Sequence, residues 1–512
     1  MDTDVLIIGA GPSGLMLANQ LKRRGTAMRI IDRHAGPARE TRALGVQART
    51  LEIYQKLGLA ERALELGKKG TGANLWANGR RMARVPLGDA GAGITPFPFI
   101  LILGQDDNER IMGEKLDELG GAVEWDSELV ALTQDGTGAN ATLKRKDGGV
   151  ENVRAAWVAG CDGARSPVRE LNGIGFPGAP YEHVFFVADV EATGRMVPDE
   201  VNVYLLRAGF HLLFPMRGQD HWRVVGILPE MLRGKDVTFE ELVPYLRNEA
   251  GADLDFRSCS WFSTYRIHHR AAERFREGRC FLLGDAAHIH SPAGAQGMNT
   301  GLQDAYNLAW KLALVVAGKA DATLLDTYAA ERMPVARRLL ETTDRAFQFI
   351  VADNWLAALL RTEVVARLAA LAMSQKAIQR LAFYAVSQTD IRYRESPLSQ
   401  TLEGLPNDAP KAGDRFPWLK ARIGGETVDF FATLDDRVFN LIVAGQDAPE
   451  TGLRTWVIPS DPANDEALEA ACIPSPSFYL IRPDGHVGLC GKQLDAGVVK
   501  RYLGERIQLK SP

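Results

Sequence analysis

The chain has 512 residues, too many for one hydrophobic core, so we expect two or three domains. Its composition, 46% hydrophobic and 24% charged, is that of a globular protein, and no stretch approaches the roughly 18 apolar residues of a membrane-spanning helix. A net charge of -4 argues against nucleic-acid binding, and five scattered cysteines without a C-x-x-C pair fit a cytoplasmic protein without disulfides or a zinc ribbon.

The first predicted element is a buried strand that runs into a glycine-rich turn. Residues 5–8 are continuously apolar, the motif 9–14 follows at once, and apolar residues then recur at helical spacing. Residues 28–31 form a second short strand that ends at Asp32. Strand, glycine turn, helix, strand and a terminal acid are the context in which G-x-G-x-x-G indicates dinucleotide binding.

Each glycine of this motif has a physical role. Gly9 permits a tight turn, Gly11 lets a pyrophosphate approach the backbone, and Gly14 lets the helix pack close to the strand. The start of the helix supplies unpaired N–H groups and a positive dipole end for phosphates. Asp32 would accept hydrogen bonds from an adenosine ribose.

The middle of the chain changes character and then returns to the first pattern. Alternating strands predict an antiparallel domain inserted into the nucleotide-binding one, at 184–190, 201–206, 210–215 and 222–228. Residues 280–283 resume the buried-strand pattern and run into Gly284 and Asp285. A long amphipathic helix follows at 302–316, and a helical stretch continues over 323–387.

The tail is predicted to be a separate small α/β unit. Prolines between 397 and 410 mark a linker. The strands of the tail are expected at 438–443, 455–458 and 478–481, and a turn follows the last of them.

Three motifs in this order, at 9–14, 161–166 and 284–288, resemble those of the class A flavoprotein monooxygenases, the family of p-hydroxybenzoate hydroxylase and phenol hydroxylase. Further segments match in order at 42–52, at 104–110, and at 292–301 with Asp304, Asn307 and 310–312. The tail resembles the thioredoxin-like C-terminal domain of the phenol and polyketide hydroxylase branch. That domain lacks a redox cysteine pair, as does this tail, so we expect a structural or oligomerisation role for it.

The resemblance implies an α/β fold with an inserted α+β domain. A Rossmann-like FAD-binding domain would take up residues 1–177 and return, with a helical segment, over 276–400. An antiparallel substrate domain would span 178–275, and a thioredoxin-like domain would span 405–512.

The resemblance also implies the cofactor contacts. Gly9, Gly11 and Gly14 would hold the FAD pyrophosphate, and Asp32 would hold the adenosine ribose. Contacts with the rest of FAD and with the nicotinamide cofactor are expected from Arg42, Gln105, Asp162, Asp285, Gly294, Gly297, Met298 and Asn299. Arg42 is also counted with the catalytic residues, as is Pro292 near the hydroxylation site. The glycine run at 294–301 opens a helix whose positive dipole end would stabilise a reduced, anionic flavin.

The implied activity is hydroxylation of a phenolic or polyketide-like aromatic substrate. NADH or NADPH would donate a hydride to FAD, and molecular oxygen would then form a flavin C4a-hydroperoxide that an electron-rich ring attacks. Two alternatives stay open. One is an epoxidase or flavin reductase acting on a non-aromatic substrate such as an isoprenoid, and the other is a flavin-holding redox sensor without turnover.

Substrate residues are expected on the inserted sheet, which should cover the pocket. The candidates are Tyr204, Phe210, His211, Phe214, Trp222, Arg223 and Tyr265. His211 is the candidate catalytic base, because a neutral imidazole can accept a phenolic proton near neutral pH. Ordinary packing of an antiparallel sheet is the alternative account of each of these residues.

A pair of histidines and an apolar stretch each have a structural as well as a functional interpretation. His288 and His290 do not predict a metal site, because two histidines at i, i+2 without acidic or thiol partners make a poor zinc site. The apolar stretch 347–371 is open to three interpretations: a part of the pocket, a homodimer interface, or buried core, which is the simplest.

Overall fold

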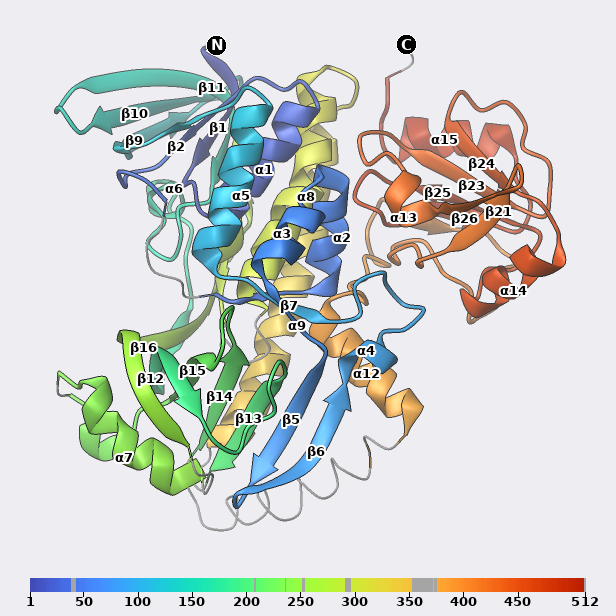
Figure 1. Cartoon of the computed structure of the whole chain (residues 1–512). Helices are drawn as coiled ribbons and strands as arrows, with labels where there is room; N and C mark the ends of the chain where they lie inside the picture. The colour runs from blue at the N-terminus through green and yellow to red at the C-terminus, as the bar shows by residue number, and fades with distance from the viewer. Residues whose placement is uncertain are drawn as a thin grey trace.

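A computed structural model describes residues 1–37, 43–206, 209–234, 236–250, 254–290, 296–351, 372 and 375–510. Figure 1 shows three parts: a sheet with long helices that contains the N-terminus, a second sheet below it, and a C-terminal unit to one side. Within the described ranges, no helix is both long and apolar enough to cross a bilayer.

The first sheet contains the predicted nucleotide-binding strands. Its path is β17-β18-β11-β1-β2-β8, and β9 and β10 extend it from β11 as antiparallel neighbours. The four central strands, β18, β11, β1 and β2, are mutually parallel, so their carboxyl ends share one edge. The bounds are β1 (Thr3–Ile8), β2 (Met28–Ile31), β8 (Val123–Glu124), β9 (Ser127–Gln134), β10 (Ala139–Arg145), β11 (Val150–Gly160), β17 (Arg276–Glu277) and β18 (Cys280–Leu282).

Helices pack on this sheet and on one another. Helix α1 (Pro12–Arg23) packs against both α5 (Gln105–Glu118) and α8 (Gly297–Val316). The predicted helix at 302–316 is therefore confirmed, and it begins five residues earlier at Gly297. The buried side of α8 belongs to the same apolar core as β1 and β11.

The second sheet is the inserted antiparallel sheet, with two additions. Its order is β19-β16-β12-β15-β14-β13-β5-β6, and only the β13–β5 pair is parallel. Its bounds are β5 (Gly72–Ala77), β6 (Arg80–Pro86), β12 (Gly178–Thr193), β13 (Val201–Leu206), β14 (Gly209–Pro215), β15 (His221–Ile227), β16 (Asp255–Ala271) and β19 (His288–Ile289). Strands β5 and β6 precede residue 178, so this sheet takes in a segment that the sequence boundaries left with the first domain.

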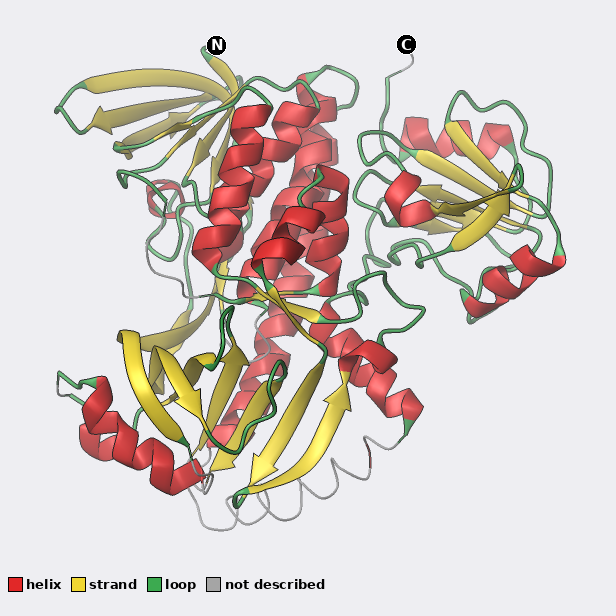
Figure 2. Ribbon diagram, viewed as in Figure 1, coloured by secondary structure: helices red, strands yellow, loops and turns green. Residues whose placement is uncertain are grey.

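The two faces of the second sheet have different covers. Helix α7 (Phe239–Ala250) packs on one face, where Leu242 and Leu246 join a buried cluster with Phe186. Helix α9 (Asp326–Val351) runs along β14 and β16, and it passes behind the sheet in Figure 2. The predicted helical stretch 323–387 is confirmed at its two ends, by α9 and by α12 (Lys376–Ser387). Most of the stretch 347–371 lies outside the described residues.

The C-terminal unit is built on a five-stranded sheet in the order β20-β26-β25-β23-β24. Strand β23 is parallel to β24 and antiparallel to β25. The three strands predicted for the tail are confirmed as β23, β24 and β25, whereas the thioredoxin resemblance stays a prediction. The bounds are β20 (Gln400–Thr401), β21 (Lys420–Ile423), β22 (Glu426–Asp429), α13 (Phe430–Thr433), β23 (Asn440–Ala444), β24 (Arg454–Ile458), α14 (Pro462–Ala470), β25 (Ser477–Ile481), β26 (Val487–Gly491) and α15 (Ala496–Glu505).

This unit shares a buried core with the rest of the chain. Trp310 of α8 lies in one apolar cluster with Phe439 and Leu441, and its ring meets Phe439 edge-on at 5.8 Å. The remaining short elements include a three-stranded sheet in the order β3-β7-β4. They are β3 (Gly45–Val46), α2 (Ala48–Leu57), α3 (Ala60–Leu66), β4 (Lys68–Gly70), α4 (Leu87–Ala90), β7 (Ile100–Ile102), α6 (Pro167–Leu171), η1 (Glu230–Leu232), η2 (Gly284–Ala286) and η3 (Ala322–Leu325).

Candidate active site

Four of the predicted site segments meet at one edge of the first sheet. Gly284 follows β18, Asp162 follows β11, Gly9 follows β1 and Asp32 follows β2. These four strands are adjacent and parallel, so the segments after them form a row at their carboxyl ends. We call this row the carboxyl edge. The crevice outside the carboxyl ends of parallel strands is the place where open α/β sheets bind ligands.

The glycines of the first turn divide into two that pack and one that faces open space. Gly9 has φ +101°, and a Cβ there would lie 2.3 Å from the Cys161 carbonyl oxygen. A Cβ on Gly14 would lie 2.0 Å from the Gly9 carbonyl oxygen. A Cβ on Gly11 would meet no heavy atom within 4 Å. Space beside a backbone at a helix start fits the approach of a pyrophosphate, so these residues fit a dinucleotide.

Asp32 is oriented toward this turn by two backbone donors. Its Oδ2 accepts a hydrogen bond from the Ala10 N–H at 2.8 Å, and its Oδ1 accepts one from the His34 N–H at 2.9 Å. The carboxylate therefore has a set orientation at the end of β2. This position, beside the glycine turn, is the one expected for an acid that binds a ribose.

The start of α8 lies beside the start of α5. Asn108 donates its side-chain amide to the Met298 sulfur at 3.1 Å, which joins the first turns of the two helices. Gln105 opens α5, and its side-chain amide donates to Glu109 at 2.8 Å. The structure thus brings Gln105 and Met298 to the same region.

Asn299 contributes its side chain to the protein itself. Its Oδ1 accepts hydrogen bonds from the Gln47 N–H at 2.9 Å and the Thr50 hydroxyl at 2.7 Å, and its Nδ2 donates to the Gly45 carbonyl at 2.7 Å. These three bonds fix the Asn299 side chain to the segment 45–50. The first N–H groups of a helix have no acceptor inside the helix, and they favour negative charge.

The Gly284-Asp285 turn packs directly on the starts of α1 and α8. Gly284 has φ +57°, and a Cβ there would lie 2.5 Å from the Ser13 hydroxyl. A Cβ on Gly301 would lie 2.4 Å from the same hydroxyl and 3.0 Å from the Gly284 Cα. Asp285 is exposed at this turn, in the position where the resemblance implies contact with a ribityl chain.

Asp162 lies at the end of β11 with an unusual protonation equilibrium. Burial raises its pKa to about 6, against the opposing effect of hydrogen bonds from Ser166 and from the Val168 N–H. The carboxyl group is therefore close to half protonated in a mildly acidic solution. Cofactor binding at this motif would change its surroundings and with them its charge.

The burial of His288 is explained by its contact with the carboxylate of Asp304. The histidine is 1% exposed, and its Nε2 lies 2.8 Å from Asp304 Oδ2. Over the part of the chain that the structure describes, no group of three histidine, cysteine or acidic side chains is suited to hold a metal ion.

The predicted substrate residues lie on opposite faces of the second sheet. Phe210 and Tyr265 belong to a cluster with Phe185, and Phe214 packs with Leu44 and Ile102 of the first domain. Arg223 is on this face too, because it alternates with Trp222 along β15. Tyr204 and Trp222 belong to the opposite cluster, under α7.

His211 has the surroundings of a packed core residue. It is 3% exposed, it alternates with Phe210 along β14, and its ring meets Phe186 of the α7 cluster edge-on at 5.7 Å. Burial lowers its pKa to about 3. A base this weak, on the face away from the first domain, does not favour the predicted role of His211 in accepting a phenolic proton.

Three predicted residues, Arg42, Pro292 and Gly294, lie outside the described residues, so their roles stay predictions. One residue of the site carried no signal in the sequence. Arg332, in the second turn of α9, forms a fully buried ion pair with Asp304 at 2.6 Å. A single arginine in an amphipathic helix is usually exposed, so only the folded chain identifies this partner of the carboxyl edge.

Comparisons with known proteins agree with this geometry. The family described as FAD binding domain matches residues 2–343. 6-Methylpretetramide 4-monooxygenase of Streptomyces rimosus is 35% identical, over 96% of this chain and 91% of that protein. Pentachlorophenol 4-monooxygenase of Sphingobium chlorophenolicum is 34% identical, over 81% of this chain and 76% of that protein. The structure of an anhydrotetracycline hydroxylase from Streptomyces rimosus matches with a TM-score of 0.78 and 30% identity, over 100% of both chains. The chain therefore belongs to the family of FAD-dependent aromatic hydroxylases.

Proposed function

We propose that this FAD-dependent monooxygenase hydroxylates a phenolic or polyketide-like aromatic substrate on the second sheet. The observation that carries the proposal is the face of that sheet opposite α7, which carries a buried cluster of aromatic rings and packs against the first domain. Relatives named for 6-methylpretetramide, rifampicin and pentachlorophenol support the same class of substrate.

The proposed substrate wall consists of rings with a charged pair beside them. The Phe185 ring lies 6.5 Å from that of Phe210 and 6.0 Å from that of Tyr265. On the same face, Arg223 forms an ion pair with Asp189. Tilted rings offer faces and edges to a flat aromatic molecule, and the ion pair would orient its polar groups.

The residues of the carboxyl edge would bind and orient the cofactor. When bound, FAD supplies hydride acceptance and oxygen activation, which side chains cannot provide. The turn at Gly11 and the start of α1 would hold the pyrophosphate, and Asp32 would hold the ribose. The start of α8 would stabilise negative charge on the flavin ring, because its N–H groups point out of the helix end.

The electron donor and the assembly complete the proposal. We propose NADPH or NADH as the donor, bound transiently, since one glycine turn in strand context serves one resident dinucleotide. A homodimer and a cytoplasmic location stay predictions.

The test is a substrate screen with purified, FAD-loaded protein. Phenols and fused-ring polyketides are added with NADPH or NADH, and NAD(P)H oxidation, oxygen uptake and product mass are followed under isotopically labelled oxygen. We expect one compound class to stimulate oxidation and to gain one labelled oxygen atom. NAD(P)H oxidation without an oxygenated aromatic product would favour the flavin reductase. Epoxidation of a non-aromatic compound would favour the epoxidase. Full FAD loading without any NAD(P)H oxidation would favour the redox sensor.

A further inference from the structure

A buried ion pair between Asp304 and Arg332 lies directly behind the Gly284-Asp285 turn. Asp304 of α8 accepts hydrogen bonds from the Gly284 N–H at 3.1 Å, from His288 at 2.8 Å and from Arg332 Nε at 2.6 Å. The side chains of Asp304 and Arg332 are both 0% exposed. Burial opposes the ionisation of Asp304, but Arg332 and His288 outweigh it and lower the pKa of this carboxyl group.

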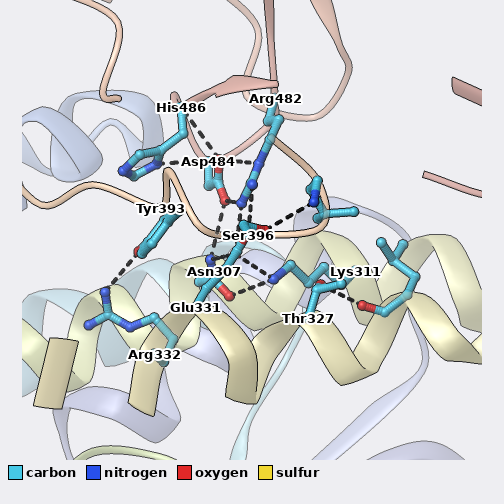
Figure 3. Close-up of polar contacts among 12 residues, drawn as sticks. Asn307, Lys311, Thr327, Glu331, Arg332, Tyr393, Ser396, Arg482, Asp484 and His486 are labelled. Atoms are coloured by element: carbon cyan, nitrogen blue, oxygen red, sulfur yellow. Dashed lines mark hydrogen bonds and ion pairs between the residues drawn. The ribbon is translucent and has the colours of Figure 1, made fainter. Parts of the chain in front are cut away.

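Arg332 also reaches two other parts of the molecule. Its Nη2 donates to the Thr300 carbonyl in the first turns of α8 at 3.1 Å, and its Nη1 donates to the Tyr393 hydroxyl at 2.8 Å. Figure 3 shows Tyr393 above Arg332 with the hydroxyl directed at the guanidinium group. One side chain thus connects the turn after β18, the start of α8 and the linker to the C-terminal unit.

The preceding residue of α9 makes a separate set of contacts. Glu331 accepts hydrogen bonds from Arg482 at 2.6 Å, from Lys311 at 2.7 Å and from the Ser396 hydroxyl at 2.6 Å. Figure 3 shows these bonds: Arg482 and Ser396 attach the C-terminal unit and its linker to Glu331, and Lys311 joins the later turns of α8 to α9. Consecutive helix residues project in different directions, so Glu331 and Arg332 serve two different neighbours.

We propose that Asp304 and Arg332 are positioning residues for FAD, which hold the Gly284-Asp285 turn and the first turns of α8 in the geometry that the flavin requires. The inference rests on the proposed function in one respect: it needs FAD to bind at this edge. Gly284 adopts a left-handed backbone, and Asp304 holds it there through its N–H group. A buried ion pair adds little net stability, whereas a fully bonded one specifies a single arrangement.

The first experiment measures FAD binding to apoprotein. Asp304→Asn keeps the size of the side chain and removes the charge that orients Arg332. We expect its Kd for FAD, measured by quenching of flavin fluorescence, to rise by at least about tenfold, with a shifted visible spectrum of the bound flavin. A folded Asp304→Asn protein with the wild-type Kd and spectrum would overturn the proposal.

A matched pair of variants decides the question if Asp304→Asn does not fold. Tyr393→Phe and Ser396→Ala each remove one hydroxyl group from the same linker segment, but one contacts Arg332 and the other contacts Glu331. We expect both to lower the melting temperature of the apoprotein, and only Tyr393→Phe to raise the Kd for FAD, by about threefold or more. Equal Kd values in the two variants would show that the network is merely structural.

Wild-type protein separates this inference from the function on which it rests. If wild-type apoprotein does not bind FAD, the proposed function fails. If it binds FAD and the Tyr393→Phe and Asp304→Asn proteins bind equally well, only the positioning role fails.

Discussion

The open space at Gly11 gives the sharpest test of where the cofactor lies. A Cβ at this position would meet no heavy atom within 4 Å, and φ is -71°, which any L-residue adopts. Gly11 is the N-cap of α1, where alanine is less favourable than glycine, but alanine also lowers the entropy of the unfolded chain, so Gly11→Ala should change the stability of the apoprotein by no more than about 1 kcal/mol. The added methyl group would instead occupy the space in which a phosphate approaches the backbone.

The expected loss of FAD affinity follows because the methyl group would keep the phosphate from its hydrogen bond with the backbone. A hydrogen bond to a charged group contributes about 1.5–3 kcal/mol, and each 1.4 kcal/mol is a factor of ten, so losing one such bond raises the Kd for FAD by about 10- to 100-fold. The assay combines thermal melting of the apoprotein with a flavin fluorescence titration.

Gly14→Ala is the matched control for this substitution. Its Cβ would lie 2.0 Å from the Gly9 carbonyl oxygen, so the backbone must shift and the apoprotein should melt at a lower temperature. Wild-type FAD affinity in a normally stable Gly11→Ala protein would refute the placement of the pyrophosphate at this turn.

Three further predictions follow from burial and from the two faces of the second sheet. Burial raises the folded-state pKa of Asp162 to about 6, so wild-type apoprotein loses stability as pH rises from about 4 to 6; Asp162→Asn should remove this loss and be about 3 kcal/mol more stable at pH 7, which denaturant melts at pH 4 and 7 would check. Phe210→Ala and Trp222→Ala should each cost about 3–5 kcal/mol of stability, because both side chains are buried, but only Phe210→Ala should raise the KM for the aromatic substrate; steady-state kinetics with the reverse pattern would contradict the assignment of faces. His211→Asn should destabilise the protein but leave the pH profile of substrate-stimulated NAD(P)H oxidation unchanged, and loss of one limb of that profile would restore His211 as a base.

Local patterns were enough to predict the first two strands of the first domain and the turn and helix between them. Residues 5–8 and 28–31 form strands, and the turn between β1 and α1 has its glycines where tight packing requires them, at Gly9 and Gly14. These features depend on neighbours along the chain, so periodicity and glycine spacing reveal them. Three strands of the tail, β23, β24 and β25, were predicted for the same reason.

Features that depend on distant partners were not accessible in this way. Strand β5 pairs with β13, with Ala73 opposite Val201, and no local pattern connects residues so far apart. The side of the sheet on which His211 lies follows from alternation along β14, but which side faces the first domain depends on where α7 packs. The buried ion pair of Arg332 could not be predicted either, since its partner Asp304 is on another helix.

The connections between the two sheets explain how substrate and flavin would meet. The chain leaves the carboxyl edge after β11 to build β12, and β16 returns it to the first sheet. Directly after the Gly284-Asp285 turn, β19 pairs with the end of β16, with His288 opposite Ala271. His288 in turn contacts Asp304, the residue that holds Gly284. The proposed substrate wall and the Gly284-Asp285 turn are thus connected through one hydrogen-bonded structure, so we expect a change in Asp304 to affect substrate turnover as well as the affinity for FAD.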